Sequence, residues 1–241
     1  MRYLLSFLVV LLFPFSAFAS IAFDNAGACT PASSASNISC SLTVGSGANR
    51  IEIIGIWADD NVSISGQITT VSYASVEASS LATSTTANGN EAVYLWCLVA
   101  PTSGSNTLKA TFTGMSGGDT FNVMATSYSG VTQTCSGLTT AIGSTNSGTN
   151  PTVSLTGSGS SPWLVGIASN SNSAVTAGSN TTSRVSDADS RNMSDSNGLV
   201  SPSALNWTSS SGAWAAAVVN LTAAGSVSSP SPILLTSVFW W

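Results

Sequence analysis

After Ala19, short runs of β-branched and aromatic residues recur along the chain, separated by Gly, Pro, Asn and Ser. Apolar residues do not repeat at the spacing of an amphipathic helix, whereas several runs alternate with a period of two. This pattern is typical of antiparallel sandwiches and jelly rolls. The sequence therefore predicts an all-β fold, a jelly-roll-like antiparallel β-sandwich with a C-terminal extension strand.

The predicted strands differ in the cover that they need. In the run 49–58 both alternating sets are apolar apart from Glu52, so this strand and the run 213–223 should be covered on both faces. The run 106–114 alternates cleanly and should face water on one side. Further strands are predicted at 21–26, 38–45, 68–76, 91–100, 121–131, 151–157, 162–170 and 203–209.

Three segments are expected along the chain. Residues 1–19 read as a secretory signal peptide, with one basic residue, an apolar run and a small-x-small site that ends at Ala19. Residues 20–224 are expected to form one β-sandwich domain, in which the polar stretch 171–203 is an edge hairpin or a loop. Residues 225–241 combine a Ser/Pro linker with an apolar tail. The predicted location is extracellular or on the cell surface.

The cysteine content fits export. The four cysteines predict two disulfides, and three connectivities are possible. Pairing Cys29 with Cys40 and Cys97 with Cys135 is favoured, because the first pair brackets a short Pro/Ser/Asn loop. A thiolate metal site is not expected, since the chain has no CxxC spacing and no histidine.

Charge and composition exclude several classes of function. Only 6% of the residues are charged, the net charge is -5, and the basic residues do not cluster. Such a chain has little with which to neutralise phosphates, so neither nucleic acid nor an anionic membrane surface is expected as a partner. No histidine is available as a general base, and disulfides would consume the thiols. We therefore expect no enzymatic activity and no cofactor.

The acidic residues offer two weaker alternatives. Asp59 and Asp60 end a predicted strand and Glu91 begins one, where side chains are usually solvated rather than catalytic. The run 187–195 holds three carboxylates that could converge on a hard cation, but it lacks the glycine and the distal glutamate of an EF-hand loop. These three are Asp187, Asp189 and Asp195. A polar surface loop is the favoured interpretation.

The sequence has candidate sites both for attached glycans and for glycan binding. Asn-x-Ser/Thr sequons occur at Asn37, Asn61, Asn180, Asn192, Asn206 and Asn220. They are candidate glycosylation sites, although a chain so rich in Ser and Thr produces many by chance. In the alternative function, an adhesin or lectin-like module, loop aromatics such as Trp207 or the polar stretch 171–203 would hold a glycan.

Three stretches follow one another along the chain: VGSGANRIEIIGIWA (44–58), YLWCLVAPTSGSNTLKATFTG (94–114) and ATSYSGVTQT (125–134). In this order they resemble a widespread, largely uncharacterised class of exported bacterial β-sandwich modules. The resemblance covers about residues 21–224, including AWAAAVVNL (213–221), and implies the fold rather than a function. Cys97 stands where these modules usually have a tyrosine, which fits an added disulfide. The resemblance supplies no catalytic residues, and the tail lies outside it.

The tail is apolar on both faces if it is extended, so it needs cover on both sides. It could be the last strand of its own sandwich, or a targeting or outer-membrane assembly signal. The favoured interpretation is a donor strand that completes the sheet of a neighbouring copy and propagates into an extracellular filament, a homopolymer. The expected assembly residues are Ile233, Leu235, Phe239, Trp240 and Trp241. The alternative donor is the mature N-terminus, residues 21–25.

Overall fold

The computed structural model describes residues 20–59, 68–87, 89, 91–113, 119–159, 161–187, 190–199 and 201–225. These residues form strands and loops and no helix, so none of them belongs to a helix able to span a membrane. All strand pairs are antiparallel. The predicted all-β class is therefore confirmed.

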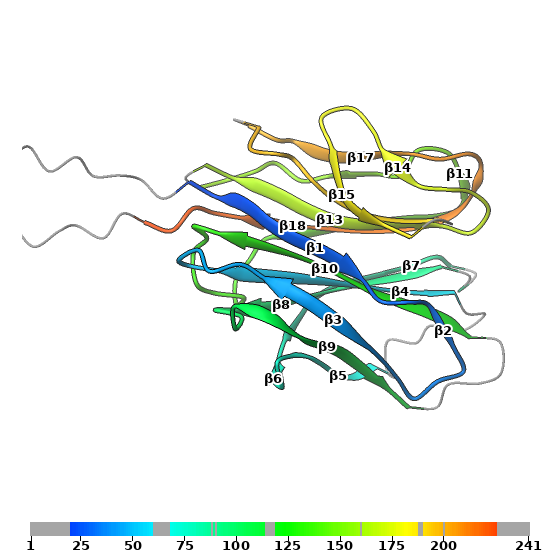
Figure 1. Ribbon diagram of the computed structural model, residues 1–241. Coiled ribbons are helices and arrows are strands. Elements are labelled where there is room, and N and C mark those ends of the chain that lie inside the picture. The colour runs from blue at the N-terminus through cyan, green and yellow to red at the C-terminus, as the bar shows by residue number, and fades with distance from the viewer. Residues whose placement is uncertain are drawn as a thin grey trace, which may run out of the picture.

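The strands form four sheets that lie on one another as layers (Figure 1). In the first half of the chain the strands are β1 (Ala22–Ala28), β2 (Ala32–Ser33), β3 (Asn37–Val44), β4 (Ile51–Asp59), β5 (Ile68–Tyr73), β6 (Val76–Glu77), β7 (Ser79–Thr85), β8 (Ala92–Val99), β9 (Gly104–Phe112) and β10 (Thr120–Ser129). In the second half they are β11 (Thr140–Gly148), β12 (Thr152–Ser154), β13 (Trp163–Asn170), β14 (Thr176–Ala177), β15 (Thr182–Ser186), β16 (Arg191–Asp195), β17 (Ala204–Thr208) and β18 (Gly212–Leu221).

Each half of the chain builds a sandwich of one outer and one central sheet. In the first half the outer sheet has the order β3-β9-β5-β6 and the central sheet β1-β10-β4-β8-β7, with β2 also paired to β10. In the second half the central sheet has the order β11-β18-β13-β16-β15 and the outer sheet β12-β17-β14. The chain passes from one sandwich to the other at residues 130–139, and the stretch 171–203 lies within the second sandwich.

The two central sheets pack face to face and share the middle one of three apolar cores. Ile53 and Trp57 of β4 face this core, opposite Ile167 of β13. Gly55 lies between them in β4, where an added Cβ would come within 2.8 Å of Ile167 and 3.0 Å of Met193. The sheets can approach this closely only because Gly55 has no side chain.

The strand β4 is buried on both faces, as its sequence predicts. Its alternate residues Ile54 and Ile56 face the core of the first sandwich. Glu52 is on that same face, fully buried, and its carboxyl has no hydrogen-bond partner among the described residues. Burial raises the pKa of Glu52 from 4.5 to about 8, so the carboxyl is protonated at neutral pH.

The buried carboxyl predicts that stability falls as pH rises. Because its folded pKa lies above the unfolded value, the folded protein binds an extra proton between about pH 4.5 and pH 8, and stability is lost across that window at up to about 1.4 kcal/mol per pH unit. The free energy of urea unfolding, measured from pH 5 to pH 8, should lose much of this slope in Glu52→Gln. The exposed Glu77→Gln variant should keep it. Equal slopes in both variants would show that Glu52 ionises freely.

Candidate functional site

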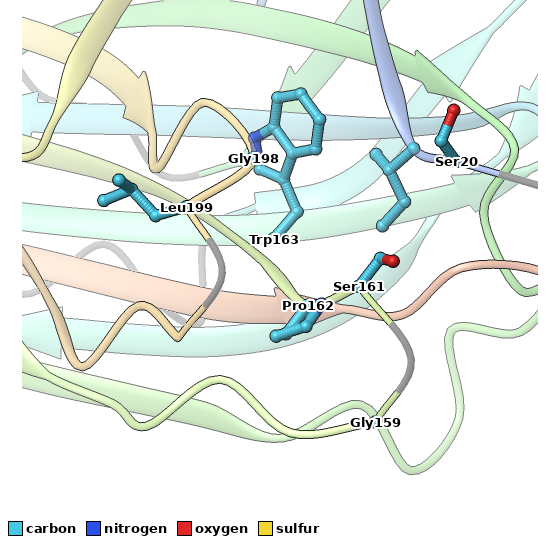
Figure 2. Close-up of a pocket in the computed structure, with 8 residues that line it drawn as sticks. Ser20, Gly159, Ser161, Pro162, Trp163, Gly198 and Leu199 are labelled. Carbon is cyan, nitrogen blue, oxygen red and sulfur yellow. The ribbon is translucent and has the colours of Figure 1, made fainter.

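The candidate site is a pocket of about 380 Å³ at the end of the stack where the described chain begins and ends (Figures 1 and 2). Three segments that are distant in sequence form it: residues 20–21 before β1, residues 159 and 161–163 at the start of β13, and residues 198–199 after β16. Its side chains are mainly apolar, from Ile21, Pro162, Trp163 and Leu199. Leu199 is 39% exposed at the rim.

Both ends of the described chain meet at Gly130, next to this pocket. Gly130 has a φ of +72°, and an added Cβ would lie 2.2 Å from the carbonyl oxygen of Ser20, which itself lines the pocket. The N–H of Ala224 donates to the carbonyl of Gly130 at 2.8 Å. The position therefore requires glycine for both its conformation and its close contact.

The loop that forms one wall of the pocket is held by backbone and side-chain hydrogen bonds. Ser196 exchanges two bonds of 3.0 Å with Leu164, one through each backbone N–H. Asn197 donates its N–H to Asp195, and its Oδ1 accepts from Nη2 of Arg184 at 2.8 Å. The wall is thus fixed to β13 and to the hairpin of β15 and β16.

A buried ion pair lies beneath this wall. Nε of Arg184 is 2.6 Å from Oδ2 of Asp195, and the two side chains are 14% and 0% exposed. The hydroxyl of Tyr128 donates to the same carboxylate oxygen at 2.9 Å, which links the two central sheets. Burial and the negative charge of Asp195 raise the pKa of Tyr128 well above its usual value, so it stays a neutral donor.

An aromatic column leads from β1 to the pocket. The rings of Phe23 and Tyr128 meet edge to face at 5.9 Å, and those of Tyr128 and Trp163 meet at 5.9 Å with a tilt of 59°. Arg184 lies over the ring of Phe23 at 4.2 Å. Trp163 ends the column at the pocket, and its buried Nε1 has no acceptor among the described residues.

A second, smaller pocket of about 270 Å³ shares Leu199 with the first. Its remaining lining is uncharged and polar, from Asn180, Thr181, Thr182, Ser196 and Asn197. Hydroxyls and amides of this kind can bind a polar, uncharged ligand.

The structure corrects the prediction that Glu91 is a solvated strand-end carboxylate. Glu91 is buried, and Nε1 of Trp57 donates to it at 2.6 Å. The guanidinium of Arg191 lies over the ring of Trp57 at 3.0 Å from its centroid. Asp60 and the side chain of Asp59 lie outside the described residues, so no carboxylate pair with Glu91 is described.

The carboxylates of the run 187–195 do not converge. Asp187 pairs with Arg191 and accepts from Asn122, whereas Asp195 pairs with Arg184 at the other end of β16. Asp189 lies outside the described residues. The polar-loop interpretation is also wrong for part of this run, because all five residues of β16 are buried.

Other predicted residues fall into clear groups. Both disulfides form as predicted, Cys29 with Cys40 and Cys97 with Cys135. Among the sequon asparagines, Asn37 and Asn180 are exposed and Asn206 is half-buried, but Asn192 and Asn220 are buried within strands and are closed to glycosylation in the folded chain. Asn61 lies outside the described residues.

Trp207 is not a loop aromatic that could hold a glycan. It is buried in β17, and its Nε1 donates to Ser194. Of the alternative donor, residues 21–25, all but the first lie in β1, which pairs with β10 of the same chain in the isolated subunit. The signal peptide and the assembly residues Ile233, Leu235, Phe239, Trp240 and Trp241 lie outside the described residues.

Sequence reasoning missed the ion pair and the walls of the pocket. In a chain with only five basic residues, two of them, Arg184 and Arg191, fall within one polar stretch. Asp187 and Asp195 fall within the same stretch, so these neighbouring opposite charges were a usable signal for ion pairs.

Comparisons with known proteins identify no relative: no family model, curated protein or solved structure matches this chain. The resemblance to exported bacterial sandwich modules therefore stays a prediction. Function must be argued from the geometry alone.

Removing the Arg184 guanidinium should destabilise the protein. Arg184→Met leaves the buried Asp195 carboxylate without its cation, which should cost about 3 kcal/mol of unfolding free energy. The double variant with Asp195→Asn should lose less, since the buried charge is then absent. Chemical denaturation measures both, with the exposed Lys109→Met as control at under about 0.5 kcal/mol. A loss in Arg184→Met no larger than in the control would contradict a buried pair.

Proposed function

We propose that this chain is a structural subunit of an extracellular filament, in which residues 233–241 of one copy add a strand to a sheet of the next. The protein acts in this proposal without catalysis and without a cofactor. A signal peptide at residues 1–19 exports it, and the two disulfides suit an oxidising compartment.

One observation carries the proposal: the described residues already cover both faces of each central sheet. They form three apolar cores, one between the central sheets and one inside each sandwich. The tail sequence is apolar on both faces, so it needs cover of its own on both sides. A neighbouring copy is the simplest source of that cover.

The edges of the sheets indicate where such a strand can pair. All four edge strands of the central sheets carry a register shift, in β1 at 23/25, in β7 at 80/82, in β11 at 145/148 and in β15 at 183/185. Bulges of this kind disfavour pairing with another strand. In contrast, β3 pairs with β9 from Asn37 to Val44 in continuous register. It is the longest unbulged edge among the described strands, and we propose it as the acceptor. The outer face of this sheet is exposed, so side-by-side packing of copies would have to cover the second apolar face of the added strand.

The surface composition also favours assembly. With 6% charged residues, copies can pack side by side while few charges lose their solvent. Burying the large apolar side chains of the tail would contribute roughly 1.5–3 kcal/mol each, before the cost of ordering the strand. That gain, together with backbone pairing, is sufficient for a polymer.

A second candidate is a glycan-binding module. The observation that favours it is the polar pocket lined by Asn180, Thr182 and Asn197, since amides and hydroxyls suit the hydroxyls of a sugar. Electron microscopy of the purified protein, combined with glycan-array binding, distinguishes the filament subunit from the glycan-binding module. Fibres support the subunit, and monomers that bind glycans support the module.

Deleting residues 230–241 should abolish assembly. The truncated protein should remain folded and monomeric, because the described residues before the deleted part already supply three apolar cores. Sedimentation and electron microscopy measure assembly, and circular dichroism checks the fold. A synthetic peptide of residues 230–241 should bind the truncated protein without restoring fibres, whereas a scrambled peptide should not bind.

Two results would contradict the proposal. Polymers formed by the truncated protein would show that the tail is not the donor. Unfolding of the truncated protein, under conditions where the intact chain is a folded monomer, would show that the tail is an ordinary strand of its own sandwich.

A further inference from the structure

We propose that the pocket beside Trp163 is the resting site for the aromatic end of the tail, residues 239–241, of the same chain. The inference deepens the proposed function, on which it rests, by stating where the donor segment lies before a subunit joins a filament. The monomer would then be capped by its own tail and would assemble by exchanging that contact for a neighbour.

The point where the chain leaves the stack lies close to the pocket. The N–H of Ala224 is bonded to Gly130, Gly130 contacts Ser20, and Ser20 lines the pocket. The linker 225–232 spans at most about 29 Å when fully extended, so the tail can return to the pocket from the place where it leaves the stack. A segment tethered this close has an effective concentration in the millimolar range. A dilute neighbour therefore competes poorly for the same pocket.

The size and lining of the pocket suit an aromatic side chain. The pocket is open at the rim, has the volume for an indole ring and is lined mainly by apolar side chains, among them Trp163. Phe239, Trp240 and Trp241 supply aromatic rings that the linker does not. A ring bound against Trp163 would extend the column of Phe23, Tyr128 and Trp163 by one member, in the tilted geometry that aromatic pairs prefer.

The part of Trp163 that borders the pocket is an apolar edge of its ring. Nε1 of Trp163 is buried and has no acceptor among the described residues. Gly198 has a φ of +70°, and an added Cβ there would lie 3.6 Å from Cζ3 and 3.9 Å from Cη2 of Trp163, so this wall passes close to the benzene edge of the indole. A docked aromatic ring would meet this edge, in keeping with the apolar lining of the pocket.

The two walls of the pocket are held in place by the surrounding structure. The loop of Ser196 to Leu199 is fixed through the ion pair of Arg184 and Asp195, and Pro162 restricts the opposite wall. A pocket that is formed before binding loses little conformational freedom when it is filled. The pocket is therefore suited to a short, reversible contact of one or two side chains.

The test is hydrogen exchange, read by mass spectrometry, on the full-length mature chain at a concentration where it sediments as a monomer. Backbone amides of residues 239–241 should exchange more slowly than in a free peptide of residues 233–241, because docking lowers the population of open states. The protection should not change on further dilution, since the contact is within one chain.

A pair of matched variants locates the contact. Leu199→Asp places a charge at the rim of the pocket and should return residues 239–241 to the exchange rate of the free peptide. Ile142→Asp makes the same change at another exposed apolar residue, 58% exposed on β11, and should leave the protection intact. Exchange of the β13 amides in both variants reports whether the stack is still folded.

Each other outcome overturns the inference. Absence of protection in the monomer means that the tail does not dock, and protection lost on dilution means that the occupant comes from a second copy. Protection that survives Leu199→Asp places the tail elsewhere. Fibre formation, measured in parallel, is independent of these results: fibres that require residues 230–241 together with an unprotected monomer would preserve the proposed function and reject the resting site.

Discussion

The apolar contact between the two central sheets is the interaction on which the rest of the structure depends. Each sandwich buries only one face of its central sheet, so the other face would be exposed if the halves separated. The strand β4 carries large apolar residues on that shared face, and Gly55 lets the opposite sheet come close. Polar clusters around Trp57 and around Tyr128 lie at opposite ends of β4 and connect the sheets there. These polar clusters are well placed to fix how the two sheets align.

The sequence predicted the strands in which apolar side chains decide the pattern. The prediction that β4 is covered on both faces is confirmed, and so is the alternation of Leu108 and Phe112 inward with Lys109 outward in β9. The strands β7 and β11 were missed because they consist largely of Ser, Thr, Gly and Asn, which resemble loop residues. The strand β16 was missed for a related reason, since its buried side chains are mostly polar and are paired inside the fold.

The candidate site was less accessible to sequence reasoning, because it depends on segments that meet only in the folded chain. Trp163 lies in the predicted strand 162–170, but nothing in its neighbourhood indicates that Ile21 and Leu199 approach it. Glu91 and Trp207 show the opposite error. Each was assigned to the surface from its local surroundings, whereas a distant partner, Trp57 or Ser194, holds it inside. Long-range pairing of single polar groups leaves no periodic signal.

The meeting of both chain ends at Gly130 determines how the module would carry mechanical load. A pull applied between residue 20 and residue 225 would enter and leave the stack at adjacent points, through the contact of Ser20 with Gly130 and the hydrogen bond from Ala224. The force would act first at one end of β1 and the bridge between Val131 and Ala223, and would open these contacts one after another. Such a pull would therefore peel outer contacts before it reached the shared core, and the chain would yield by a small extension while its disulfide-linked interior stayed intact.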